Sequence, residues 1–425
     1  MSRLPRPSAL LATTAAGALV ALSGVLPAAA TPSPSPTPAA QPAQYTYPPL
    51  APRPTSTANS PQAPDPNPPR GGIGPLGEPV GGARLLTRKV IAPAQTPALP
   101  QGINAQSWIL VDLDNGNVLA ARDPHGRYQP ASIFKTLLSI TVLPLLPAHK
   151  VIIAAGTEHA EGSAAGLVDG GKYTTDELFE ALLLVSGNDA AAALATAAGG
   201  ISHTVDLMNK NALALGAYDT YAQTPSGLDG WQQLTSAYDM ALFLREAVNM
   251  PRFIEYDEKP TVTLPPVTVP GASYGSVQLQ NQSLQFLTSV PGALVVKTGF
   301  TDAARHTYLA AMKRGDRRIG VVLLRGQQYP MGMREQAVAL MNWGLALPSA
   351  TQPVGRLDPA VQPSAPASKQ QTSRHAAAAA ASSRRRSSGG TPLGVKIAVV
   401  AALLAAGGVL SRAIGRPSRV VGESS

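Results

Sequence analysis

Short apolar segments, each a few residues long, mark strands in the central part of this chain. The segments SWILVD (107–112) and NVLAAR (117–122) flank the turn sequence Asp114-Asn115-Gly116. Two apolar runs joined by such a turn predict a β-hairpin. Further along the chain, three more apolar segments predict strands: 294–297, 307–312 and 318–324.

Between these strand segments, apolar residues recur at the spacing of one helix face. The helices predicted in this way are 132–143, 176–185, 189–198, 202–215, 236–248 and, after the last strand, 332–345. Strands at both ends of the region with helices between them predict an α+β fold. In it, helices cover one antiparallel sheet that is built from both parts of the region, and a helical subdomain lies beside the sheet.

The N-terminal apolar run has the layout of a secretory signal peptide. Arg3 and Arg6 precede a run rich in Ala, Leu and Val, and Pro27-Ala28-Ala29-Ala30 follows it as a small-residue cleavage site. Residues 1–30 are therefore predicted to export the rest of the chain. Retention of the run as a signal anchor is the alternative, and export follows from both.

A second apolar run, at 393–411, predicts a transmembrane helix. Its 19 residues are interrupted only by Lys396, which lies close enough to one end to reach the membrane interface. Because basic residues flank both ends, their charges do not decide the orientation. The predicted signal peptide decides it instead, so the central region is expected outside the cell membrane and 412–425 as a cytoplasmic tail.

Proline and glycine set the composition of the segments between these runs and the centre. The chain has 41 Pro and 39 Gly but only 5% aromatic residues, which indicates that part of it does not pack into a core. Residues 31–84 are predicted to be a Pro-rich linker and 349–392 a low-complexity linker. The folded domain is then expected to span 85–348.

The charge and the missing cysteines exclude several classes of site. The formal net charge is +9, of which 1–70 carries +3 and 352–425 carries +8, so the region between them is slightly acidic. This distribution argues against nucleic acid as a partner. The absence of cysteine excludes disulfides, thiolate metal sites and cysteine nucleophiles. No histidine has metal-ligand spacing, and we expect neither a metal nor another cofactor.

Ser132 and Lys135 stand three residues apart at the start of a predicted helix, which places both side chains on one face. A serine hydroxyl needs a base to become a good nucleophile, and lysine can serve when burial or nearby cations lower its pKa. The N-terminus of a helix disfavours a protonated amine and offers backbone N–H groups to an oxyanion. The Ser-x-x-Lys motif alone is weak evidence for a catalytic site, because this spacing also occurs by chance.

Two further motifs follow in chain order. Ser186-Gly187-Asn188 lies in the link between two predicted helices, where it can aim a hydroxyl and an amide at Ser132, or simply cap the second helix. Lys297-Thr298-Gly299 ends a predicted strand, where glycine permits close backbone approach. Each motif has an ordinary structural explanation, but the three together in this order favour a catalytic site.

These three motifs resemble those of the penicillin-recognising serine acyltransferases. From about 105 to 345 the chain is similar to the D-alanyl-D-alanine carboxypeptidases among them, the low-molecular-mass penicillin-binding proteins. The similar segments are 130–135, 186–190, 208–216, 224–229, 235–241, 297–304 and 334–344. The resemblance implies the fold shared by serine β-lactamases and penicillin-binding-protein transpeptidases, and a role in peptidoglycan biosynthesis and cell shape at the bacterial membrane.

The resemblance also implies a reaction and a role for each residue. The implied catalytic residues are Ser132, Lys135, Ser186, Asn188 and Lys297, and the implied substrate-binding residues are Thr298, Gly299, Phe300 and Arg334. Ser132 would attack the penultimate D-alanine of a stem pentapeptide while Lys135 takes its proton, and β-lactam antibiotics would acylate the same serine. The backbone N–H groups of Ser132 and Phe300 would form the oxyanion hole, and Thr298 and Arg334 would hold the terminal carboxylate.

Three alternatives remain beside this hypothesis. A D,D-endopeptidase or a weak serine β-lactamase would use the same fold, although the chain has no glutamate between Lys210 and Gly230 to activate a deacylating water, and Gly187 replaces the Asp of the β-lactamase motif. Ser226 stands where some relatives have His. Many relatives carry a second all-β domain, and we expect none after Pro348. The non-enzyme alternative is a wall-tethered binding module, which has no need of all three motifs.

Overall fold

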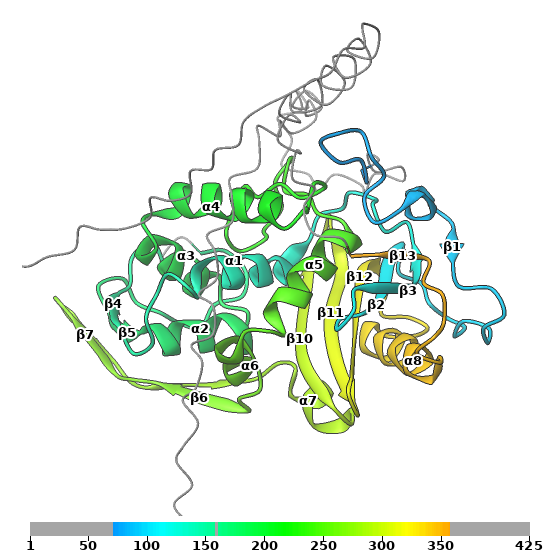
Figure 1. Cartoon of the computed structure of the whole chain (residues 1–425). Coiled ribbons are helices and arrows are strands. Elements are labelled where there is room, and N and C mark those ends of the chain that lie inside the picture. The colour runs from blue at the N-terminus through cyan, green and yellow to red at the C-terminus, as the bar shows by residue number, and fades with distance from the viewer. Residues whose placement is uncertain (1–70, 158–159, 358–425) are drawn as a thin grey trace, which may run out of the picture. The chain divides into compact units, whose positions relative to one another are not determined.

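An antiparallel sheet of seven strands forms the centre of the part of the chain that the structure, a computed structural model, describes: residues 71–157 and 160–357 (Figure 1). Its strands are β1 (Val90–Ile91), β2 (Ser107–Asp112), β3 (Asn117–Arg122), β10 (Ala293–Thr301), β11 (Arg305–Arg314), β12 (Arg317–Gly326) and β13 (Gly355–Arg356). The order across the sheet is β1-β3-β2-β12-β11-β10, and β13 also pairs with β3. The sheet therefore joins both parts of the chain, as the sequence predicted, through the pairing of β2 with β12.

Helices cover both faces of this sheet (Figure 1). Helix α5 (Ala237–Ala247) lies on one face, with α1 (Lys135–Val142) packed against it, and α7 (Leu284–Ser289) and α8 (Met333–Ala346) lie on the other face. Ile109 and Val111 of β2 pack into the core cluster that contains α1 and α5, while Trp108 and Leu110 pack into the cluster that contains α8. Successive side chains of a strand point to opposite faces, so every residue of β2 is buried. The predicted α+β fold is confirmed.

The helical part of the fold lies beside the sheet (Figure 1). It contains α2 (Thr175–Leu184), α3 (Asn188–Ala197), α4 (Ile201–Ala214) and α6 (Pro251–Asp257), with the small strands β4 (Val151–Ile153) and β5 (Lys172–Thr174). A capping box explains where α2 begins. The Glu177 backbone N–H donates to Thr174 Oγ1 (3.2 Å), and the Thr174 N–H donates to Glu177 Oε2 (2.7 Å).

A two-stranded arm, Thr261 to Gln280, leaves the body near α6 (Figure 1). Its strands are β6 (Thr261–Leu264), β7 (Val267–Val269), β8 (Ala272–Tyr274) and β9 (Val277–Gln280), paired as β6 with β9 and β7 with β8. The pairing breaks at Pro265 and Pro266, because proline has no backbone N–H to donate to a ladder.

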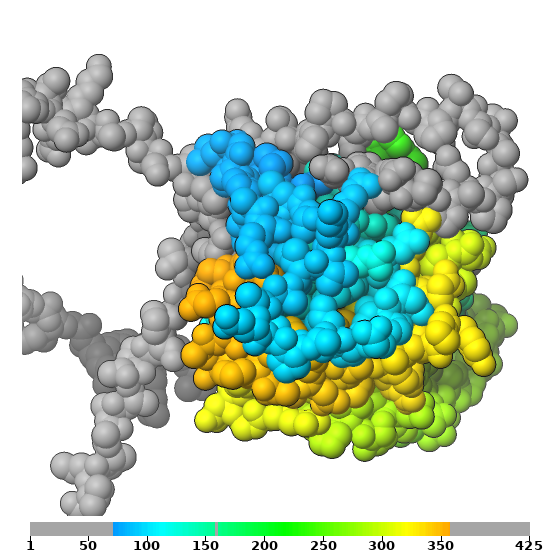
Figure 2. All heavy atoms as spheres, turned by 90° about the vertical axis from the view of Figure 1, so that its right-hand side faces the viewer, coloured from blue at the N-terminus to red at the C-terminus, as the bar shows by residue number. Residues whose placement is uncertain are grey.

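The folded body extends beyond the predicted limits of 85 and 348. At the N-terminal side, Gly71 N–H donates to His125 O (3.1 Å), and a 3-10 turn η1 follows at Ala83–Leu86. At the C-terminal side, Arg356 N–H donates to Gly81 O (3.0 Å). Composition marked both segments as linker, but backbone hydrogen bonds hold them. Figure 2 shows the first and last described segments side by side on one face.

The predicted signal peptide (1–30), transmembrane helix (393–411) and cytoplasmic tail (412–425) lie outside the described residues, as does most of each predicted linker. Of the helices formed by residues 71–157 and 160–357, none is long and apolar enough to cross a membrane.

Candidate active site

Ser132 lies in a tight 3-10 turn, η2 (Ala131–Phe134), rather than in the first turn of a helix as predicted. Helix α1 begins only at Lys135. Ala131 has a left-handed φ of 49°, and Thr307 Oγ1 of β11 donates to Pro130 O (2.9 Å). These constraints hold the turn against the sheet and fix the position of the Ser132 backbone.

Lys135 is fully buried and contacts three oxygen atoms. Its Nζ lies 3.0 Å from Ser132 Oγ, 2.6 Å from Asn188 Oδ1 and 3.0 Å from Ser226 O. An amide oxygen and a carbonyl oxygen can only accept hydrogen bonds, whereas a hydroxyl can also donate. A neutral Lys135 amine satisfies all three partners when its two N–H bonds point at Asn188 and Ser226 and its lone pair points at the Ser132 hydroxyl.

The surroundings of Lys135 favour this neutral form. Burial lowers the pKa of Lys135 well below its ordinary value, the nearby charge of Lys297 lowers it further, and Asp189 opposes both effects. Burial also lowers the pKa of Lys297, to about 8, against the opposing charge of Asp257. The site therefore holds one amine able to accept a proton beside one that is still largely protonated near pH 7.

Ser186 and Asn188 join α2 to α3 beside Lys135. The structure rules out the capping explanation for their motif, since Gly187 is the N-cap of α3 and no side chain caps the helix. The Asn188 amide instead bridges Lys135 and Glu161 O. Ser186 has a left-handed φ of 59°, and its buried Oγ finds no hydrogen-bond partner among the described residues. Such strain with an unsatisfied polar group is typical of functional positions.

Strand β10 passes so close to the Ser132 turn that only glycine fits at position 299. A Cβ there would lie 2.7 Å from the Ser132 backbone N and 2.5 Å from Thr307 Oγ1. This approach brings the part of β10 next to Gly299 alongside the Ser132 backbone N–H. Lys297, two residues earlier, is buried, whereas the Phe300 side chain is half exposed and lies against the His306 ring.

A cavity of about 310 Å³ opens on the other side of Gly299. Residues that line it include Thr298, Gly299, His306, Thr307, Arg334 and Glu335. In the first turn of α8, the Arg334 guanidinium donates through Nε and Nη2 to Glu335 Oε1 (2.9 and 2.5 Å). Of the predicted site residues, Thr298, Gly299 and Arg334 line this cavity, in which the Arg334 guanidinium pairs with Glu335.

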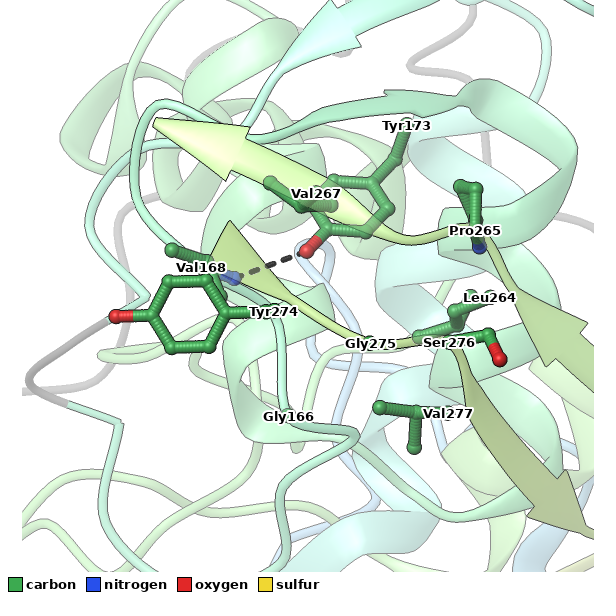
Figure 3. A pocket seen from close by; sticks show the side chains of 10 residues that line it. All are labelled: Gly166, Val168, Tyr173, Leu264, Pro265, Val267, Tyr274, Gly275, Ser276 and Val277. Carbon is green, nitrogen blue, oxygen red and sulfur yellow. Dashed lines mark hydrogen bonds between the residues drawn. The ribbon is translucent and has the colours of Figure 1, made fainter. Parts of the chain in front are cut away.

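A second cavity, of about 260 Å³, lies between the arm and the loop that contains Gly166 and Val168 (Figure 3). Val168 N–H donates to the Tyr173 hydroxyl at its wall (3.1 Å). It is lined by none of the predicted site residues. Elsewhere in the described ranges, no three His, Cys, Asp or Glu side chains are placed to hold a metal ion.

The sequence did not reveal several contacts that build the site. The Asp189 carboxylate accepts from the backbone N–H groups of Ala165, Gly166 and Leu167 (2.9 to 3.0 Å), which fixes the loop beside Asn188. The sequence feature that could have identified Asp189 is its position directly after the Ser186-Gly187-Asn188 motif. Ser226 acts through its main-chain carbonyl, so its residue type carries no signal at all.

Comparisons with known proteins agree with this geometry. The model of the family described as D-alanyl-D-alanine carboxypeptidase matches residues 93–328. Over 262 residues the chain is 38% identical to D-alanyl-D-alanine carboxypeptidase DacB2 of Mycobacterium tuberculosis, a match that covers 60% of this chain and 87% of that protein. It is 30% identical to DacD of Escherichia coli, over 58% of this chain and 64% of that protein.

Solved structures show the same similarity. The crystal structure of D-alanyl-D-alanine carboxypeptidase from Mycobacterium tuberculosis matches with a TM-score of 0.58 at 38% identity, covering 63% of this chain and 99% of that one. A Streptomyces DD-transpeptidase matches with a TM-score of 0.55 at 24% identity, covering 59% of this chain and 100% of that one. The second match bears on the fold alone.

Proposed function

The chain belongs to the D-alanyl-D-alanine carboxypeptidase family and is a serine-type carboxypeptidase, and we propose that it removes the terminal D-alanine from peptidoglycan stem pentapeptides through an acyl-enzyme on Ser132. The observation that carries this proposal is the 3.0 Å contact between Lys135 Nζ and Ser132 Oγ. Burial lowers the pKa of that lysine, so the amine can take the hydroxyl proton as the bond to the substrate forms.

The reaction divides into two steps. In the first, Ser132 Oγ attacks the carbonyl carbon of the penultimate D-alanine, and its proton passes to Lys135. The oxyanion accepts hydrogen bonds from the backbone N–H groups of Ser132 and Phe300. The close approach of Gly299 to the Ser132 backbone N supports this placement. The proton on Lys135 then passes to the leaving amine by way of the Ser186 hydroxyl, while Asn188 and Lys297 position the substrate. In the second step, water attacks the ester and Ser132 regains its proton.

The cavity beside Gly299 suits the leaving residue. Thr298 and Arg334 line it and hold the carboxylate of the terminal D-alanine. When the substrate binds, the Arg334 guanidinium gives up part of its hydrogen bonding to Glu335 and donates to the substrate carboxylate instead. β-Lactam antibiotics carry a carboxylate and a reactive carbonyl, so they bind in the same way and acylate Ser132.

The place of the reaction follows from the ends of the chain. The predicted signal peptide at 1–30 exports the enzyme, and the predicted transmembrane helix at 393–411 anchors it, with the catalytic domain in the cell-wall space of a bacterium. The patterns of apolar and basic residues in these segments support this assignment. Peptidoglycan lies outside the membrane, so an enzyme that acts on it must be exported.

The acyl-enzyme gives the direct test of this function. The full-length chain incubated with benzylpenicillin should gain the mass of one penicillin, and peptide mapping should place it on Ser132. The same preparation should release D-alanine from a stem pentapeptide. An adduct on Ser186, the other serine of the site, or no adduct at all would contradict the proposed nucleophile. An adduct lost within seconds would favour the β-lactamase alternative, and cleavage of cross-linked stems alone would favour the endopeptidase.

Arg334→Gln should weaken binding of the pentapeptide more than it slows catalysis. A charged hydrogen bond contributes about 1.5–3 kcal/mol, so we expect KM to rise about 10- to 100-fold with a smaller change in kcat. Steady-state release of D-alanine measures both constants. Arg314→Gln, at the exposed end of β11, is the matched control and should leave KM unchanged. An unchanged KM for Arg334→Gln would remove Arg334 from the carboxylate site.

A further inference from the structure

Asp257 is a buried carboxylate beside β10 to which the mechanism above gives no role. It is the last residue of α6 and only 2% exposed. Its Oδ2 accepts from the backbone N–H of Val296 (3.0 Å), and Asn281 Nδ2 donates to its main-chain carbonyl (2.8 Å). The carboxylate is therefore fixed next to the residue that precedes Lys297.

Lys297 is buried as well, at 3% exposure, and among the described residues Asp257 is the carboxylate that acts on its charge. Its Nζ donates to the neutral Thr298 O (3.2 Å), and within the described ranges it forms no ion pair. Burial lowers its pKa to about 8, and the charge of Asp257 opposes that shift. Burial likewise raises the pKa of Asp257 to about 7, and Lys297 opposes it. Each group thus stabilises the ionised form of the other.

The two lysines of the site need opposite protonation states. Lys135 must be neutral to accept the Ser132 proton, and a charged Lys297 helps to keep it so. Asp189, the carboxylate that acts on Lys135, is already held by backbone N–H groups of the loop that starts at Ala165. A second carboxylate is needed to keep Lys297 charged, and Asp257 is placed to supply it.

We propose that Asp257 is a positioning residue that holds the positive charge on Lys297 and so keeps Lys135 as the unprotonated amine of the pair. Asp257 does not touch the substrate and acts through Lys297. Of the other titratable groups near this pair, Glu258 on the same segment acts on Asp257. Asp257 in turn acts on Tyr308 of β11, and Lys297 acts on Lys135 of α1. The inference rests on the proposed function, because it assigns Lys297 a charge that the reaction uses.

Asp257→Asn tests the charge without removing the hydrogen bond, because the amide oxygen still accepts from Val296 N–H. Activity requires a charged Lys297 and is lost as pH rises through the Lys297 pKa. Without the carboxylate this pKa falls. The alkaline limb of kcat/KM for D-alanine release should therefore move about one unit to lower pH, and the rate at pH 8 should drop about fivefold. The penicillin acylation rate of the full-length chain should show the same shift.

Thermal unfolding distinguishes this proposal from a purely structural role of Asp257, for which Asp257→Asn would lose stability. The pKa of Asp257 is about 7 in the fold and about 3.9 in an unfolded chain. A carboxylate whose pKa is raised by folding costs stability as pH rises between these two values, and the full cost remains above pH 7. Asp257→Asn should therefore unfold at the same or a higher temperature than the wild type at pH 8, even though its activity is lower there.

Glu255→Gln is the matched control, an exposed carboxylate on the same helix, and should keep the wild-type pH profile. If Asp257→Asn does not fold, Asp257→Ser keeps a smaller hydrogen-bond acceptor for Val296 and should show the same shift. The inference is wrong if Asp257→Asn has the same pH profile as the wild type. It is also wrong if the variant loses rate equally at every pH and unfolds at a lower temperature. If the wild type itself forms no penicillin adduct on Ser132, the proposed function fails, whatever Asp257 does.

Discussion

Ser132→Ala is expected to form no penicillin adduct and to release D-alanine from the pentapeptide slower by on the order of 10⁴-fold or more. The variant removes the hydroxyl that lies against Lys135, and no other hydroxyl among the described residues is bonded to that amine. Ser186 is close by, but its Oγ has no partner to take its proton. Intact-mass spectrometry after incubation with penicillin, together with a D-alanine release assay, measures both effects.

Ser139→Ala is the matched control for this variant. Ser139 is also buried, lies two turns further along the same helical segment, and has no hydrogen-bond partner for its hydroxyl in the described part of the chain. Its removal should leave acylation and D-alanine release at the wild-type level. An adduct retained by Ser132→Ala would mean that another residue is the nucleophile.

Local sequence patterns were enough to predict the elements that carry the site. The turn at Asp114-Asn115-Gly116 identified the β2–β3 hairpin although every residue of β2 is buried and shows no alternation. Helices α2 to α5 follow the apolar spacing to within one or two residues. The same patterns placed Ser132 inside a helix. The left-handed φ of Ala131 and the hydrogen bond from Thr307 have no local sequence signal, so the tight turn could not be predicted.

Long-range contacts set the rest of the site. The spacing of Ser132 and Lys135 predicted one of the three contacts of the lysine, because both residues lie on one short segment. The other two come from Asn188 and Ser226, 53 and 91 residues away. Asn188 was inferred from its place in the link between two predicted helices, and the family resemblance then implied its catalytic role. The Ser226 carbonyl could not be inferred, since every residue has one.

The predicted boundaries of the linkers also depend on long-range contacts that composition does not reveal. Proline and glycine content marked the chain up to residue 84 as unfolded, yet Gly72 N–H donates to Asp219 Oδ1 (2.9 Å) and His125 Nε2 lies 3.1 Å from Val80 O. A segment of this composition is held in place by partners on the domain rather than by a core of its own. Composition indicates that the segment has no core of its own, but it does not indicate the contacts that hold the segment on the domain.

Lys135→Arg is expected to slow both acylation by penicillin and D-alanine release by about 10²- to 10⁴-fold, which is the contribution of a positioned general base. Arginine keeps a positive charge at the site, but its pKa is so high that it cannot accept the Ser132 proton. Lysine can, because burial and the charge of Lys297 lower its pKa. The variant therefore separates proton transfer from simple electrostatic attraction. The rate of acylation by a fluorescent penicillin measures the effect.

Lys135→Met removes the base at similar volume and adds no charge, and it should lose as much activity as Lys135→Arg. It leaves Asn188 Oδ1 and Ser226 O without the Lys135 amine, so thermal unfolding must show that it is folded before its rate is compared. Lys210→Ala, on the exposed face of α4, is the control and should act like the wild type. If Lys135→Arg acylates at the wild-type rate, Lys135 is not the base. In that case its contact with Ser132 serves only to orient the hydroxyl.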